Sequence, residues 1–312
     1  MKKLKILFLL MIPVVAATLF FTFSITTKLN KYEAKKMEKH ELLNAEARMG
    51  NIWEWDIEME DIPLSKWFTD WLTGKEDVME LSYDLDTEAN KWYNSAVKHG
   101  LIFLGIVVVF MIAVNLLYKD KLVRNQAIGL SLVIASCCFL YLGLNEPFLE
   151  IEAYKDDMQI QVPIMGMDTK ITMEGRAYFF YQNKSVLTLI KLLYNGGNYF
   201  VAIAVIVFSI LFPIIKLTSS FIIFLNPTAK AGKKAITLID KLGKWSMADV
   251  FVAASYLAYF SFANTELAIE TGSSTLIGLY FFTAFVVFSI VSGIFLKRTV
   301  INAMNQKELE EA

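Results

Sequence analysis

The chain has 312 residues, of which 55% are hydrophobic, and a formal net charge of −1. Its mean hydropathy is +0.46. A soluble domain of this length does not need so many apolar residues to form its core, so the composition indicates a membrane protein. The near-neutral charge comes without a sustained basic face, so nucleic acid is set aside as a partner.

About six apolar segments are long enough to cross about 30 Å of hydrocarbon as transmembrane helices. Helices are expected because an open strand leaves unpaired backbone groups in lipid. The predicted spans are 6–26, 101–118, 127–144, 200–225, 247–263 and 276–296. The first span follows MKKLK and is either a cleaved signal peptide or an uncleaved anchor. Its apolar core of about twenty residues favours the anchor.

Basic residues in the short loops predict the orientation, with both termini cytoplasmic. They follow the second, fourth and sixth spans, at Lys119, Lys121, Arg124, Lys230, Lys233, Lys234, Lys241, Lys244, Lys297 and Arg298. The loop between the fifth and sixth spans is acidic. Five lysines on the predicted outer side disagree, although the rule weakens in a long translocated segment. These are Lys28, Lys31, Lys35, Lys36 and Lys39.

The first outer segment, about 27–99, is predicted to form a mixed, acidic and tryptophan-rich extracytoplasmic insert. It begins with a charged stretch that favours a helix, KYEAKKMEKHELLNAEARM. Its tryptophans could form a small core, lie at the membrane interface or contact a partner. They are Trp53, Trp55, Trp67, Trp71 and Trp92. The run DLDTE, 84–88, lacks the glycine and closing glutamate of a calcium loop, so a solvated acidic turn is expected.

The second outer segment, between the third and fourth spans, predicts a small β element. MQIQV and TKITM alternate apolar and polar residues, and the turn-like IMGMD lies between them. After it, SVLTLIKLLYNGG predicts an amphipathic helix that ends at Gly196 and Gly197 and lies flat on the outer leaflet.

Residues that could carry chemistry are few outside the spans. Cys137 and Cys138 are adjacent in an apolar run and are interpreted as packing residues. His40 and His99 each lack a second metal ligand at a useful spacing, so we expect solvated histidines, no metal and no cofactor. We find no nucleophile with a base and no phosphate-binding glycine loop, so we expect neither catalytic residues nor an enzyme.

The fourth span contains FSILFPIIKL, in which Lys216 is a charge within an apolar run. Ser209 and Lys216 are seven residues apart and share a helix face, and Pro213 has no amide hydrogen to donate to the Ser209 carbonyl. The spacing predicts a polar strip on a kinked helix, with Ser289 of the sixth span, or Ser255 or Ser261 of the fifth, as its nearest polar candidates. Lys216 either faces this network, where it could exchange a proton, or extends to the inner headgroups.

Before the fifth span, WSMADV predicts a helix start. Ser246 can accept a hydrogen bond from the N3 amide, and Asp249 can reach back to the Ser246 amide in a capping box. Trp245 is typical of a membrane interface. These roles are structural.

The stretches FSILFPIIKL, LGKWSMADVFV and LYFFTAFVVFSIVSGIFLKR together resemble the repeated unit of the paraquat-inducible protein A family, over about 127–303. The resemblance implies a four-helix membrane domain, 127–312, that follows an N-terminal transmembrane hairpin with its outer insert, 1–126. It implies an inner-membrane protein that moves membrane lipids with a periplasmic MCE-type partner. Family members typically carry two units, each with a cysteine-pair zinc ribbon, whereas this sequence has one unit and no CxxC, which puts a zinc-dependent role in doubt.

Two functions remain open from the sequence. The chain could be an α-helical, multi-pass inner-membrane component of lipid transport, coupled to protons through Lys216. Alternatively, it could be a non-transporting membrane scaffold or envelope-stress sensor whose tryptophan-rich insert binds a partner.

Overall fold

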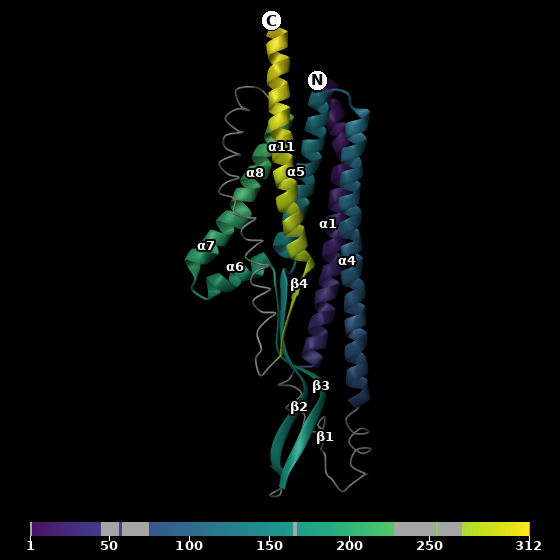
Figure 1. Ribbon diagram of the computed structural model, residues 1–312, viewed down its shortest axis with the longest axis vertical. Helices are drawn as coiled ribbons and strands as arrows, with labels where there is room; N and C mark the ends of the chain where they lie inside the picture. Colours follow the sequence, from purple (N-terminus) through teal and green to yellow (C-terminus); the bar gives the residue numbers. More distant parts are fainter. Residues whose placement is uncertain are drawn as a thin grey trace.

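A computed structural model describes residues 2–44, 56–57, 75–164, 167–227, 254 and 270–311. Long helices run along the molecule, and a β-sheet extends from the end opposite to the one that carries both termini (Figure 1). We call the end of the molecule that carries both termini the terminus half. The sheet half is the opposite end, which contains the sheet and the charged helical segments beside it.

Helix α1 (Lys2–Leu42) and helix α4 (Lys75–Leu117) form a long antiparallel hairpin (Figure 1). Each helix continues far beyond its predicted apolar span. In α1, residues 27–42 contain neither proline nor glycine, so nothing local ends the helix where the apolar run stops. The acidic turn predicted at 84–88 is wrong, because these residues lie inside α4. Trp92 lies in α4 as well, whereas the other four tryptophans of the insert lie outside the described residues.

A charged seam joins the extended parts of α1 and α4. The five lysines that follow the first span all have a partner in it. The pairs are Lys28–His99 (3.3 Å), Lys31 over the Trp92 ring (4.2 Å), Lys35–Glu88 (3.3 Å), Lys36–Asp86 (3.3 Å) and Lys39–Asp86 (2.8 Å). These lysines therefore belong to a helix–helix interface, not to a basic loop.

Helix α5 (Lys121–Asn145) is the buried centre of the terminus half and packs against α1, α4 and α11 (Ile277–Glu311). Its contact with α11 is close at Gly143, where an added Cβ would lie 2.8 Å from the backbone of Phe282. Small residues at helix interfaces allow backbones to approach in this way. Because α5 contacts helices on both sides of residue 126, the core crosses the predicted domain boundary, and the two-domain division stays a prediction.

The sheet has four antiparallel strands in the order β1-β3-β2-β4. They are β1 (Asp56–Ile57), β2 (Leu149–Ile164), β3 (Met167–Lys184) and β4 (Glu270–Thr275). The predicted β element is confirmed, because MQIQV of β2 pairs with TKITM of β3 around Ile160 and Ile171. The register shifts near Asp157, whose φ of 48° is left-handed, so a bulge divides the hairpin.

Helix α6 (Val186–Asn195) follows the sheet, as predicted. Ser185 caps its start, since its Oγ accepts a hydrogen bond from the Thr188 amide at 3.2 Å. The Gly196 amide donates to the Leu192 carbonyl, and Gly197 has a φ of +77° that favours glycine. The position of α6 on a leaflet stays a prediction.

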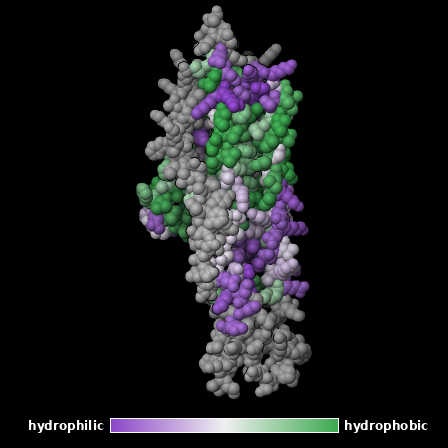
Figure 2. Space-filling model, viewed as in Figure 1, coloured by the Kyte–Doolittle hydropathy of each residue, from purple (hydrophilic) through white to green (hydrophobic). Residues whose placement is uncertain are grey.

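Five helices among the described residues are long and apolar enough to cross a membrane. They include Leu9–Leu42, Met79–Leu117, Lys121–Asn145, Tyr199–Leu225 and Ile277–Asn305. Figure 2 shows a hydrophobic band on the terminus half, with hydrophilic residues on either side of it. The sixth predicted span, 247–263, lies outside the described residues, so the number six stays a prediction.

Candidate functional site

The segment Tyr199–Leu225 is helical throughout but changes type in the middle. Helix α7 (Tyr199–Ile206) passes into a π-helical turn, η2 (Val207–Leu211), and then into α8 (Phe212–Leu225). The Phe212 amide donates to the Val207 carbonyl, five residues back. This turn directly precedes Pro213, which cannot donate to the carbonyl four residues back. Where the sequence predicts a kink, the structure thus has a π-helical turn, a feature that is frequent at functional sites.

The predicted polar strip lies on the buried face of η2 and α8. Ser209, Pro213, Lys216 and Ser220 follow one another at intervals of four, three and four residues, which is one face of a helix. Ser209 and Ser220 are each 2% exposed, Pro213 is buried and Lys216 is half-buried. Ser209, Pro213 and Lys216 thus follow one another along this segment, and their role as a transport site stays a prediction.

Ser289 lies on α11, which packs against α8. It is 2% exposed, and its hydroxyl has no hydrogen-bond partner among the described residues. Its carbonyl accepts a hydrogen bond from the Ser292 hydroxyl at 3.0 Å. Ser289 is thus a buried polar group of the same helix bundle, but the described contacts do not join its hydroxyl to Ser209 or Lys216.

Residues 228–253 and 255–269 lie outside the described part of the chain. This includes the capping motif of Trp245, Ser246 and Asp249, together with the alternative partners Ser255 and Ser261. Their predicted roles are not tested by the structure.

An apolar groove of about 570 Å³ lies between α1, α5, α6 and the η2–α8 segment. It is within the roughly 300–1,000 Å³ of small-molecule sites. Its lining residues are Val15, Thr18, Leu19, Val133, Ile134, Cys137, Leu140, Tyr141, Leu144, Asn145, Leu187, Ile210, Ile214, Leu217, Thr218 and Phe221. The groove was not predicted, because these residues come from distant segments that each look like an ordinary membrane span.

Three polar side chains of the groove, those of Thr18, Thr218 and Asn145, each donate to the carbonyl four residues back, at 2.8 Å. The two threonine hydroxyls therefore add little polarity to the groove surface, whereas the Asn145 amide retains its oxygen and a second hydrogen for other partners. Leu19 and Ile214 at its edge are 67% and 47% exposed, so the groove is open at the surface of the hydrophobic band.

The end of the groove nearest the sheet is more polar. Tyr141 and Asn145 lie there, followed by Glu146, which caps the end of α5. Glu146 is 4% exposed, and its Oε1 accepts a hydrogen bond from the Thr26 hydroxyl at 3.0 Å. Burial raises the pKa of Glu146 to about 7, with only a partial opposing effect of Thr26. A long apolar groove with polar groups at one end can accept an amphipathic molecule.

The helices and the hydrophobic band define the protein as a multi-pass helical membrane protein. Residues 171–303 match the family model described as paraquat-inducible protein A, which confirms the resemblance over this segment. Neither the comparison with curated proteins nor that with solved structures gave a match. The groove is formed partly by matched residues, on α6, η2 and α8, and partly by α1 and α5, which lie outside the match.

Proposed function

We propose that the protein is the integral-membrane component of a lipid transport system of the bacterial inner membrane, and that it works with a periplasmic MCE-type protein. The observation that carries this proposal is the apolar groove. It opens at the surface that faces hydrocarbon, and it ends in polar groups near the boundary of the hydrophobic band. A lipid could enter it sideways, with its acyl chain among Leu140, Ile214 and Phe221 and its headgroup near Asn145.

The proposed orientation places both termini in the cytoplasm. The α4–α5 connection lies at the same end of the molecule as both termini (Figure 1). It carries Lys119, the first turn of α5 carries Lys121 and Arg124, and Lys297 and Arg298 follow the apolar part of α11. Such clusters mark the cytoplasmic side of short loops. The sheet half is then periplasmic, where an MCE-type partner would meet it.

We propose further that Lys216 couples transport to proton movement. Support comes from its place in the sequence between two buried serines, Ser209 of η2 and Ser220 of α8. A charged side chain inside a membrane bundle is costly and commonly marks a transport path. The neighbouring π-helical turn gives the same helix a segment whose backbone hydrogen bonds can change register. No catalytic step is part of this proposal.

The groove is tested with Ile214→Trp, whose indole would fill it. The matched control is Ile222→Trp on the same helix, because Ile222 is 58% exposed and lies outside the groove. In cells that depend on the protein, Ile214→Trp should abolish rescue of the envelope-lipid defect at normal protein abundance, and Ile222→Trp should not. A photo-crosslinking residue at 214 should label phospholipid more strongly than one at 222. Equal rescue and equal labelling would contradict the groove as the lipid path.

The coupling is tested with Lys216→Met. We expect normal or increased abundance with loss of transport, because a half-buried charge is replaced by an apolar side chain of similar length. Lys191→Met on α6, outside the candidate spans, is the control and should keep activity. Full transport by Lys216→Met would remove proton coupling from the proposal and leave the groove untouched.

The alternative is a non-transporting scaffold or stress sensor. The size of the sheet half favours it, since strands of 16 and 18 residues and the extended hairpin could serve as a docking platform. A neighbouring gene for an MCE-type protein would favour transport. A functional protein with the groove filled by Ile214→Trp would favour the scaffold.

A further inference from the structure

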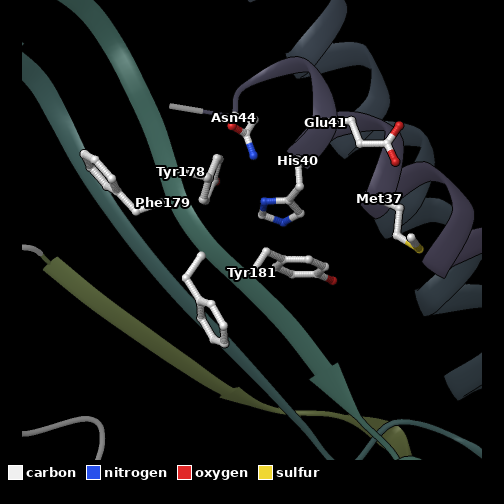
Figure 3. A pocket seen from close by; sticks show the side chains of 8 residues that line it. Met37, His40, Glu41, Asn44, Tyr178, Phe179 and Tyr181 are labelled. Atoms are coloured by element: carbon white, nitrogen blue, oxygen red, sulfur yellow. The ribbon is translucent and has the colours of Figure 1, made fainter. Parts of the chain in front are cut away.

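Where α1 ends against the sheet, His40 is enclosed between aromatic rings. It is 6% exposed, so the expectation of a solvated histidine is wrong. Its ring stacks on Tyr181 at 3.5 Å between centroids and meets Tyr178 edge-on at 4.2 Å. Figure 3 shows the His40 ring directed from α1 toward β3 between these two tyrosines. The helix and the sheet therefore hold this imidazole in one orientation.

Two carboxylates of β2 face the same place. Glu150 and Glu152 are two residues apart in a strand and so project from the same side of the sheet. Glu150 is 5% exposed, and its Oε2 accepts hydrogen bonds from the Tyr32 and Ser274 hydroxyls, each at 3.2 Å. Its other oxygen, Oε1, has no hydrogen-bond partner among the described residues.

The three side chains are close enough to share one ion. One ligand atom from each of His40, Glu150 and Glu152 lies within 4.8 Å of the other two. His40 Nε2 and Glu152 Oε1 are 3.5 Å apart. Two ligands of a tetrahedral zinc ion, at bond lengths of about 2.1 Å, are separated by about 3.4 Å. This contact thus matches two ligands on one metal.

Hydrogen bonding within the cluster is incomplete. Among the described residues, neither ring nitrogen of His40 has a hydrogen-bond partner, although the ring is buried. The buried Tyr181 hydroxyl also lacks one in this part of the structure. Buried polar atoms are nearly always satisfied by protein, water or an ion. A buried imidazole without a hydrogen bond, beside two carboxyl groups, therefore indicates a ligand-binding site, a feature that a cluster of acidic residues alone would not supply.

Lys36 is the internal alternative to an ion, and it satisfies the cluster poorly. Its Nζ lies 3.8 Å from Glu150 Oε1, too far for a hydrogen bond, and 3.3 Å from Asp86 Oδ1. Asp86 also binds Lys39. Around this point three carboxyl groups, those of Asp86, Glu150 and Glu152, thus share two ammonium groups, those of Lys36 and Lys39.

The electrostatics of the two glutamates agree with a site for a cation. Burial raises the pKa of Glu150. Burial would also raise the pKa of Glu152, but the neighbouring His40 ring, Glu150 and the Lys36 ammonium together lower it. A bound cation would favour the ionised form of both carboxyl groups.

We propose that His40, Glu150 and Glu152 bind a divalent transition-metal cation of the zinc class. The imidazole ligand disfavours calcium and magnesium, which prefer oxygen ligands alone. A hollow of about 200 Å³ beside His40, lined by Met37, Glu41 and Asn44 among others, gives access from solvent (Figure 3). The cation would fasten the end of α1 to β2, outside the hydrophobic band and outside residues 171–303 that match the family.

The test is Zn²⁺ binding by the full chain, purified in detergent without a histidine tag. We expect one Zn²⁺ per chain by metal analysis after dialysis, and a rise in melting temperature on adding Zn²⁺. Addition of Co²⁺ should give the visible absorption of a tetrahedral site. His40→Gln and Glu152→Gln should each weaken Zn²⁺ binding at least about tenfold, since each removes a ligand.

The matched controls are His99→Gln, which removes the other histidine, and Asp84→Asn, which removes an exposed carboxylate of α4. Both should bind Zn²⁺ like the original chain. Lys36→Met should bind at least as well, because a competing ammonium is gone. Absence of Zn²⁺ binding by the original chain would overturn the proposal, as would equal binding by His40→Gln and Glu152→Gln in correctly folded protein. Stronger binding of Ca²⁺ or Mg²⁺ than of Zn²⁺ would overturn the assigned metal class.

Discussion

Helix α1 is held against its neighbours by different interactions in the terminus half and in the sheet half. In the terminus half, polar side chains such as Thr18 bond to their own helix, and apolar side chains such as Phe103 make the contacts between helices. In the sheet half, lysines of α1 pair with carboxylates and rings of α4. Helix α1 continues through both without a break.

The comparison shows that the environment of the side chains changes along α1, whereas the helical structure does not. Ion pairs between helices are worth little in water, whereas unpaired charges in hydrocarbon are expensive. The ion pairs that hold α1 against α4 therefore lie in the sheet half, where water can still reach them. This also explains the basic cluster after the first span. The seam matches its lysines to acidic and aromatic partners, so the topology rule for loops does not apply to it.

The largest effect should follow from separating helices in the terminus half. Gly143→Leu would place a side chain against the Phe282 backbone of α11, and we expect a loss of about 3 kcal/mol of stability. Gly105→Leu is the control, because nothing lies within 4 Å of a Cβ at that position. Thermal unfolding in detergent measures both, and equal melting temperatures would mean that α5 and α11 do not pack as described.

The next effect concerns Glu146, at the boundary between the halves. Its pKa in the folded chain, about 7, is above its ordinary value of 4.5, so folding favours the protonated form. The contribution to stability is complete below about pH 4.5 and is lost as the pH rises through about 7. Between about pH 5 and pH 8 the loss should be about 2 kcal/mol. Glu146→Gln should remove this part of the pH dependence of the melting temperature, and an unchanged pH profile would contradict the assignment.

A smaller effect is expected in the charged seam. Asp86→Asn leaves Lys36 and Lys39 without their shared carboxylate and should cost about 1 kcal/mol. Asp84→Asn, at an exposed position two residues away on α4, should cost almost nothing. Chemical unfolding of both variants provides the comparison. Equal stabilities would show that the ion pairs of the seam do not stabilise the fold.

The smallest effect should come from salt. Raising the ionic strength from about 0.1 M to about 1 M shortens the screening length from about 10 Å to about 3 Å. The free energy of local opening in residues 27–42 should fall by a few tenths of a kcal/mol, so that their amide hydrogens exchange slightly faster. Exchange in α5 should not change. A uniform response would mean that the two halves do not differ in the way described.

Hydropathy and alternation were sufficient to predict much of this fold. They identified the five spans that the structure describes, the β2–β3 pairing and the capped helix α6. The length of α1 and α4 could not be predicted from hydropathy, because a helix does not end where its solvent changes. Nor could the groove, because α1, α5 and α8 each bring only a few ordinary apolar residues to it.

The metal cluster was missed for a related reason. His40 and Glu150 are 110 positions apart, and only the extension of α1 along the sheet brings them together. The line of polar residues along η2 and α8 could be predicted, since Ser209 and Lys216 belong to one continuous helical segment and are seven residues apart. The π-helical turn before Pro213 was predicted only as a kink, because a missing donor does not by itself determine how the backbone adjusts.

The length of the β2–β3 hairpin sets how far this membrane protein can reach. Strand β2 has 16 residues and begins shortly after α5 ends, so at about 3.3 Å per residue it measures roughly 50 Å. That exceeds the roughly 30 Å thickness of the hydrocarbon that the helices cross. In the orientation proposed, a periplasmic partner need not approach the lipid surface to be contacted. Deleting two residues from each strand would shorten that reach by about 7 Å and keep every remaining side chain on its own face of the sheet.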